Sequence, residues 1–135
     1  MAREEQMALC FITDADQRVL LMQRRDPWQL QLPGGRVEEG EVPAQAAIRE
    51  LHEELDIAVT ALHRIGSNVF EQAGTNYFYE LFRVTQFEGI PRLSEPQIYH
   101  DTDYYNLARY SVKQIGLSAV AENVCTLIQN GELQF

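Results

Sequence analysis

The stretch GRVEEGEVPAQAAIRELHEELDI, residues 35–57, joins a glycine-bounded segment to a strongly acidic and periodic one. Pro43 suits the first position of a helix, and apolar residues recur after it at helical spacing, so the pattern predicts a helix over Pro43–Leu55. Just upstream, Pro33-Gly34-Gly35 predicts a loop in which the backbone can approach another group closely. The helix face expected to pack inward consists of Ala44, Ala47, Ile48, Leu51 and Leu55.

Three glutamates of the predicted helix, Glu50, Glu53 and Glu54, stand at positions i, i+3 and i+4, which places their carboxylates on one stripe. Like charges at this spacing destabilise a helix by about 0.2–0.5 kcal/mol per pair, so a partner is expected. One alternative is a solvated face with an ion pair between Arg49 and Glu53. The adjoining glycine loop favours the other alternative, a site where Mg²⁺ or Mn²⁺ bridges carboxylates and phosphate oxygens.

The pattern Gly35-x5-Glu41-x7-Arg49-Glu50-Leu51-x-Glu53-Glu54-x-Asp56-Ile57 resembles the Nudix box. It departs from the box at Asp56, where glycine is expected; this position ends the helix, and aspartate tolerates the left-handed conformation better than most residues. The segment 28–35 and the order of predicted elements also resemble a small Nudix domain. The resemblance therefore implies an α/β/α sandwich with a mixed β-sheet, formed by residues 1–135 as a single domain.

The resemblance also implies a divalent-metal hydrolase in which water attacks a phosphorus of a nucleoside diphosphate derivative. Mg²⁺ would be the cofactor, with Mn²⁺ as the other possibility. Glu50 or Glu54 would also activate water, Glu41 would assist, and Arg49 would orient a neighbouring glutamate within the catalytic group. The implied metal ligands are three carboxylates and one backbone carbonyl: Glu50, Glu53, Glu54 and Gly34.

Substrate contacts are expected from several parts of the chain. In this family a further acidic group often comes from the loop before the last strand; Glu95, Asp101 and Asp103 are candidates, and Asp101 and Asp103 are preferred. Arg24 could neutralise phosphates, with Arg25 beside it as a second basic group, and the amides of Gly34 and Gly35 could hold phosphate oxygens. The nucleobase could stack on an aromatic side chain, although core packing is the alternative for each: Phe78, Tyr79, Phe82 and Trp28.

The remaining segments predict further strands and a second helix. Two early strands are expected to form a hairpin through a polar turn, and an aromatic strand is expected inside a sheet. The last helix has Ser118 as its N-cap and Gly131 as its stop signal. The predicted ranges are Met7–Thr13, Arg18–Gln23, a strand within Ala58–Val69, the aromatic strand Asn76–Thr85 and a helix spanning Leu117 to Ile128.

Composition limits the partners. A net charge of -9 disfavours long nucleic acid, although 7 of the 20 acidic residues are concentrated between Glu38 and Asp56. The apolar run Met7–Ile12 is too short for a signal peptide or a membrane span, so a cytoplasmic protein with no membrane partner is expected. Cys10 and Cys125 lie in apolar stretches, which predicts buried thiols rather than a disulfide or a zinc site. An exposed aromatic strand could serve a homodimer.

The sequence favours one branch of the family for the substrate. No proline occurs between Asp56 and Ile90, which disfavours ADP-ribose pyrophosphatases, whereas Tyr77 keeps dinucleoside polyphosphate hydrolases open. The short chain most resembles the MutT-like branch, which converts nucleoside triphosphates, oxidised ones included, to monophosphate and pyrophosphate. Nucleotide-sugar hydrolysis, a non-catalytic nucleotide-binding module and RNA decapping are the alternatives. Because every acidic position of the box is filled, retained catalysis is favoured.

Overall fold

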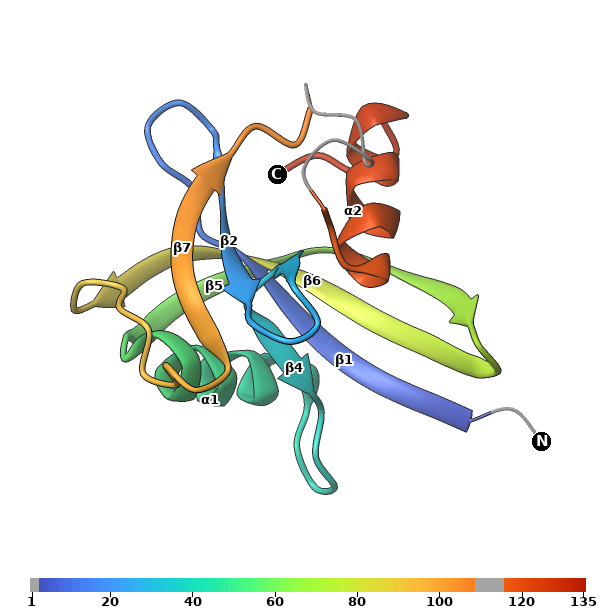
Figure 1. Cartoon of the computed structure of the whole chain (residues 1–135), viewed down its shortest axis with the longest axis horizontal. Helices are drawn as coiled ribbons and strands as arrows, with labels where there is room; N and C mark the ends of the chain where they lie inside the picture. The colour runs from blue at the N-terminus through green and yellow to red at the C-terminus, as the bar shows by residue number, and fades with distance from the viewer. Residues whose placement is uncertain (1–2, 109–115) are drawn as a thin grey trace.

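The computed structural model describes residues 3–108 and 116–135, and within them it places two β-sheets between two helices (Figure 1). The predicted domain, residues 1–135, also includes residues 1–2 and 109–115, which lie outside the described part. The elements are β1 (Arg3–Phe11), β2 (Val19–Arg24), β3 (Gln29–Gln31), β4 (Gly34–Arg36), α1 (Pro43–Leu55), β5 (Ala58–Gln72), β6 (Thr75–Glu88), β7 (Tyr99–Tyr105) and α2 (Ala119–Gln129).

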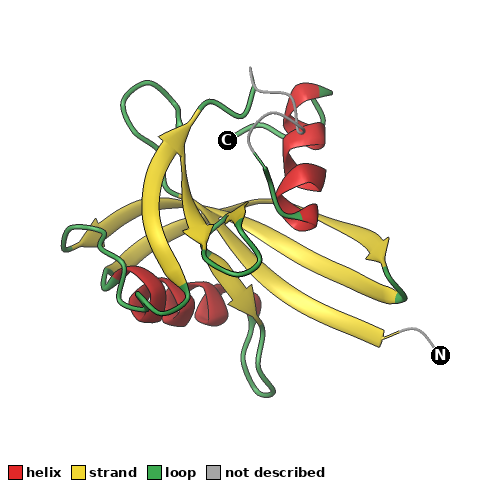
Figure 2. Cartoon of the chain, in the orientation of Figure 1, coloured by secondary structure: helices red, strands yellow, loops and turns green. Residues whose placement is uncertain are grey.

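The larger sheet is mixed. In the described residues its strand order is β4-β1-β6-β5, with β1 parallel to β6 and the other pairs antiparallel. The smaller sheet, β3-β2-β7, is antiparallel. Helix α1 lies against one face of the larger sheet and α2 lies on the opposite side, as Figure 2 shows by the two red helices flanking the yellow strands. The expected α/β/α sandwich with a mixed sheet is confirmed.

Strands form in all four predicted regions, but the hairpin expected between the two early strands does not extend beyond its turn. Strand β6 lies between β1 and β5, as its aromatic pattern predicts, and β5 covers the predicted range from Ala58. The early strands touch only at the Thr13–Val19 bridge and then enter different sheets. Both edges of β1 are already paired, with β4 and β6, so β2 has no edge of β1 to extend along.

The core has two parts because alternate residues of a strand face opposite sides. In β1, Ala8 and Cys10 pack with α1, whereas Leu9 and Phe11 pack with α2. Strand β2 divides in the same way, so both sheets contribute to both parts. Cys10 and Cys125 are buried thiols that no disulfide joins, as predicted. No helix among the described residues is long and apolar enough to cross a membrane.

Helix α1 has the predicted bounds but a different inward face. Gln45 accepts a hydrogen bond from the backbone N–H of Val42 at its start, and Asp56 ends it in the left-handed conformation at φ 56° and ψ 39°. Ile48, expected to be buried, is 41% exposed, while Glu54 is only 3% exposed. The helix is therefore rotated so that a glutamate enters the interior. Its buried residues are Ala46, Ala47, Leu51, Glu54 and Leu55.

Helix α2 begins and ends at the predicted signals. The Ser118 hydroxyl accepts a hydrogen bond from the Ala121 N–H at 3.3 Å. At the other end Gly131 has φ 75°, and its N–H donates to the Ile128 carbonyl at 3.1 Å. The next N–H, of Glu132, donates to the Leu127 carbonyl at 2.9 Å, which completes a Schellman motif.

Leu51 is fully buried on α1, whereas Ile48 on the same helix is partly exposed. We expect Leu51→Ala to lower the free energy of unfolding by about 2–5 kcal/mol, because it removes buried methyl groups and leaves a cavity. Ile48→Ala, the matched control, should change it by no more than about 0.5 kcal/mol. Urea unfolding followed by circular dichroism measures both, and equal losses in the two variants would contradict the described orientation of α1.

Candidate active site

The acidic centre of the site is Glu54, a carboxylate held inside the fold. Its Oε1 accepts a hydrogen bond from the Gly34 N–H at 2.8 Å, and its Oε2 lies 3.5 Å from the hydroxyl of Tyr99. Burial raises the pKa of Glu54 well above its ordinary value, and the negative charges of Glu50 and Glu95 raise it further. The two groups that bond to it are neutral, so its negative charge is poorly compensated.

The two glycines before the helix allow this approach. Gly34 and Gly35 belong to the short strand β4 rather than to the predicted loop, and they pair with Leu9 and Ala8 of β1. A Cβ on Gly34 would lie 2.1 Å from the Ala8 carbonyl oxygen, and one on Gly35 would lie 2.5 Å from Glu50 Oε1. Any side chain here would displace β1 or the Glu50 carboxylate, which explains why glycine suits both positions.

Arg49 connects the outer carboxylates. Its guanidinium bonds to both oxygens of Glu41, at 2.8 and 3.0 Å, to Glu50 at 3.0 Å and to Glu53 at 3.3 Å. A further bond, of 3.0 Å, reaches the Arg36 carbonyl oxygen. The bonds from Arg49 and from the Glu38 N–H lower the pKa of Glu41. The half-buried Glu50 keeps a raised pKa, because burial outweighs the effect of Arg49.

Of the loop carboxylates, the structure brings Glu95 towards this group. Glu95 lies in the segment before β7, and its charge raises the pKa of both Glu50 and Glu54. Asp101 and Asp103, the preferred candidates, lie within β7, where each accepts a bond from the next backbone N–H, of Thr102 and of Tyr104. Both are exposed, and neither is among the charges that act on the buried glutamates.

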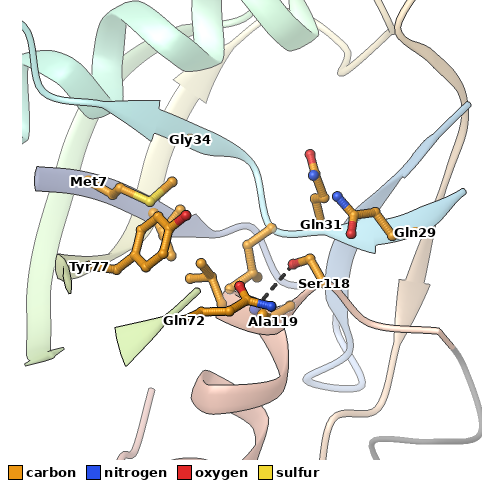
Figure 3. A pocket seen from close by; sticks show the side chains of 12 residues that line it. Met7, Gln29, Gln31, Gly34, Gln72, Tyr77, Ser118 and Ala119 are labelled. Carbon is orange, nitrogen blue, oxygen red and sulfur yellow. Dashed lines mark hydrogen bonds between the residues drawn. The ribbon is translucent and has the colours of Figure 1, made fainter. Parts of the chain in front are cut away.

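A cavity of about 240 Å³ adjoins Gly34 (Figure 3). It lies between the strands and the start of α2, with Met7 and Tyr77 on one side and Gln29 and Gln31 on another. The Tyr99 hydroxyl donates to Gln31 Oε1 at 3.0 Å. Tyr99 therefore lies next to both Gln31, which lines the cavity, and the buried Glu54. The whole lining is uncharged: Met7, Leu9, Gln29, Gln31, Leu32, Gly34, Gln72, Tyr77, Ser118, Ala119, Val120 and Ala121.

Comparison with known proteins places these features in a family. The family model described as the NUDIX domain matches residues 5–118. The chain belongs to the Nudix family. The zebrafish (Danio rerio) protein named oxidized purine nucleoside triphosphate hydrolase is 42% identical over 64 residues, which span 46% of this chain and 41% of that relative.

Solved structures agree on the fold. A MutT Nudix hydrolase from Burkholderia pseudomallei matches with a TM-score of 0.77 and 23% identity, over 91% of this chain and 95% of that one. The MutT protein of Methanosarcina mazei Go1 gives a TM-score of 0.78 at 18% identity, over 97% and 96% of the two chains. At these identities the likeness shows the Nudix fold alone.

The residues of the Nudix box fit a divalent cation by their chemistry, although the side chains do not surround one. Within residues 3–108 and 116–135, no three histidine, cysteine, aspartate or glutamate side chains are close enough to hold a metal ion together. Arg49 binds Glu50 and Glu53, and Glu54 is turned towards Gly34. The donors are nevertheless carboxylate oxygens, which Mg²⁺ prefers, and the buried Glu54 has no cationic partner among its bonds.

Several other predicted contacts lie apart from the Nudix box. Arg24 ends β2 and lies near Tyr99; burial raises the pKa of Tyr99, and the charge of Arg24 offsets part of that rise. Arg25 donates to the Pro96 carbonyl at 2.7 Å. Phe78 is half-exposed beside a different cavity, which Val69 and Gln6 also line. Tyr79 and Phe82 pack in the core, and Trp28 lies over Gly116.

The cavity residues other than Gly34 were not predicted as a group because they come from elements far apart in the sequence, among them β1, β3, β6 and α2. Tyr77 projects to the opposite face of β6 from its neighbour Phe78, and the strand alternation alone does not show which face adjoins a cavity. Gln29 and Gln31 share a face of the three-residue strand β3, whose i, i+2 spacing is the available signal. The start of α2 lines the same cavity, which brings these separate elements together beside Gly34.

The raised pKa of Glu54 predicts a pH-dependent stability. Below the ordinary value of 4.5 the carboxyl is protonated in both folded and unfolded chains and costs nothing; as pH rises above 4.5 the unfolded chain ionises first, so folding weakens until the folded pKa is passed. We expect Glu54→Gln to melt at a higher temperature than wild type in EDTA, by a margin that grows as the pH rises from 4.5 towards the raised pKa of the folded protein. Thermal unfolding across this range measures the margin.

Glu53→Gln is the control, because the Glu53 side chain is 50% exposed on the same helix. Its melting temperature should stay near that of wild type and change little relative to it across the range. A constant margin for Glu54→Gln would show that the buried charge does not weaken folding.

Proposed function

We propose that the protein is a Mg²⁺-dependent Nudix pyrophosphohydrolase that cleaves a phosphoanhydride bond of a nucleoside triphosphate. The observation that carries the proposal is the buried, poorly compensated Glu54 carboxylate. Gly34, which donates a hydrogen bond to that carboxylate, also lines an uncharged cavity. The carboxylates suit a metal with bound phosphates, and the cavity suits a base. The filled Nudix box favours catalysis over a non-catalytic nucleotide-binding module.

Glu50, Glu53 and Glu54 would hold the metal, and Glu41 would act through Arg49, which it binds with both oxygens. When bound, Mg²⁺ supplies charge neutralisation for the phosphates and acidifies water. Arg49 fixes the side chains of Glu50 and Glu53 from the outer side of the helix. Glu50 and Glu53 would exchange bonds with Arg49 for bonds with the cation. The Gly34 carbonyl remains a proposed further ligand.

In the proposed reaction, the oxygen of a water molecule forms a bond to phosphorus while the anhydride P–O bond breaks. The water proton passes to a carboxylate, for which Glu50, Glu54 and Glu95 are the candidates, and pyrophosphate leaves from a nucleoside triphosphate with the bridging oxygen. Burial raises the pKa of Glu50 and Glu54, and the neighbouring negative charges raise it further, which favours proton acceptance by these two carboxylates.

The cavity favours a compact ligand group. Its volume of about 240 Å³ is below the roughly 300–1,000 Å³ that holds whole drug-sized ligands, so it suits a single ring system. Carboxamides such as Gln29 and Gln31 offer both donors and acceptors to a base edge. The zebrafish relative's name, oxidized purine nucleoside triphosphate hydrolase, supports a purine nucleotide, the oxidised form included, as the substrate class to test first. Cytoplasmic location and a homodimer are further proposals from the sequence.

A Mg²⁺-dependent screen tests the proposal directly. Nucleoside triphosphates, oxidised nucleotides, dinucleoside polyphosphates and nucleotide sugars are incubated with the protein, and the products are identified to locate the broken bond. We expect monophosphate and pyrophosphate from a nucleoside triphosphate. Metal binding without turnover of any compound would instead favour the binding module.

Removal of one metal-binding carboxylate should abolish most turnover. We expect Glu53→Gln to lower kcat by about 100-fold or more, beyond the 10- to 100-fold typical of changes around a metal site, because it removes a charged ligand. Circular dichroism should show an intact fold. Glu132→Gln, an exposed glutamate after α2, is the control and should turn over like wild type. Wild-type turnover by Glu53→Gln would contradict the metal assignment.

Substitution of two neighbouring aromatic residues of β6 tests which face of the sheet binds the base. Tyr77 lines the cavity beside Gly34, whereas Phe78 lines the second one. We expect Tyr77→Ala to raise KM by about tenfold with little change in kcat, because loss of one base–aromatic contact costs about 1–3 kcal/mol. Phe78→Ala should raise KM less. A larger rise for Phe78→Ala would place the base on the opposite face and support the prediction made from the sequence.

A further inference from the structure

Asp56, the position where the chain departs from the Nudix box, has a partner. The residue ends α1 with φ 56° and ψ 39°, a conformation that glycine adopts without steric cost. Its N–H caps the helix by donating to the His52 carbonyl at 3.1 Å, a bond that glycine would also make. The carboxylate is therefore what aspartate adds at this position.

That carboxylate pairs with Arg92 in the loop that leads to β7. Asp56 Oδ2 accepts bonds from Arg92 Nε at 2.8 Å and from Nη2 at 2.6 Å. The backbone N–H of Arg92 donates to the Leu55 carbonyl at 3.0 Å, so side chain and main chain attach the same residue to the end of α1. At the far side of the loop, Arg25 donates to the Pro96 carbonyl at 2.7 Å.

The residue beyond this attachment is Glu95, the loop carboxylate of the site. The N–H of Ser94 donates to the backbone carbonyl of Glu54 at 3.0 Å, which brings the following Glu95 towards the buried carboxylate. Its charge acts on both Glu50 and Glu54. Like charges repel, so in the absence of a cation the loop needs attachments that keep Glu95 in this place.

We propose that the Asp56–Arg92 ion pair positions the loop 89–98 and thereby holds Glu95 beside Glu50 and Glu54. Asp56 and Arg92 are positioning residues that touch neither substrate nor metal. The effect on turnover rests on the proposed function, whereas the effect on the loop does not. The aspartate that stands where the box expects glycine thus supports the site through the loop, without contacting substrate or metal.

The loop is tested first in the metal-free protein, by hydrogen exchange of single amides followed by NMR. Asp56→Gly keeps the left-handed helix end and removes the side chain that carries the carboxylate, and Arg92→Met removes the cation. Each should speed exchange of the Arg92-position and Ser94 amides by about fivefold, the effect of an ion pair near 1 kcal/mol. Arg18→Met is the matched control, because Arg18 also pairs with an aspartate, Asp14, at 2.7 Å on the surface. It should leave both amides unchanged.

Turnover is then compared in two backgrounds. Arg92→Met should lower kcat by about fivefold in the wild-type chain and have no further effect in Glu95→Gln, because the lost interaction acts through Glu95. Arg92→Lys should recover part of the loss. Unchanged exchange, unchanged kcat, or an equal fall in both backgrounds would each overturn the proposal. If the wild type hydrolyses no nucleotide, the proposed function fails, while the exchange rates still decide whether the ion pair holds the loop.

Discussion

The buried carboxylate of Glu54 links the acidic helix to both sheets. It accepts the N–H of Gly34 from the larger sheet and lies beside the Tyr99 hydroxyl of the smaller one, while its backbone carbonyl accepts the N–H of Ser94 from the loop before β7. A charged group is costly to bury without a charged partner, and the raised pKa of Glu54 expresses this cost. Four separate segments thus meet at one residue, whose ionised side chain is unfavourable in the metal-free protein.

Arg49 explains why the other carboxylates of the helix do not add to this cost in the same way. It bonds to Glu41, Glu50 and Glu53 together, and its single positive charge offsets part of their negative charge. Arg49 is not among the groups that act on Glu54. The stripe seen in the sequence is therefore divided into Glu50 and Glu53, whose charge Arg49 partly compensates, and Glu54, which in the proposed enzyme a cation would compensate. Such a division stabilises the helix without metal and still keeps one strong ligand available.

The spacing of residues close together in the sequence predicted much of this arrangement. The features that depend on contacts between distant residues were not predicted. The bounds of α1, the signals of Ser118 and Gly131, and the central place of β6 follow from neighbours within a few residues. The inward turn of Glu54 does not, because it depends on Gly34 and Tyr99, which lie 20 and 45 residues away. Glu95 was recognised as a candidate but not preferred, since its place depends on the bond from Ser94 to α1. A loop was predicted at Gly34 and Gly35 because their pairing partner, β1, lies far upstream in the sequence.

The division of charge also bears on the order in which ligands bind. The cavity beside Gly34 is uncharged, whereas the carboxylates next to it form a cluster of one sign. A nucleotide divides in the same way, into a base without charge and a chain of phosphates that carries several negative charges. In the proposed enzyme the cavity would accept the base with or without metal, whereas the carboxylates would repel the phosphates until a cation lay between them. Recognition of the base and admission of the phosphates are therefore separable, and in the proposed enzyme the metal decides only the second.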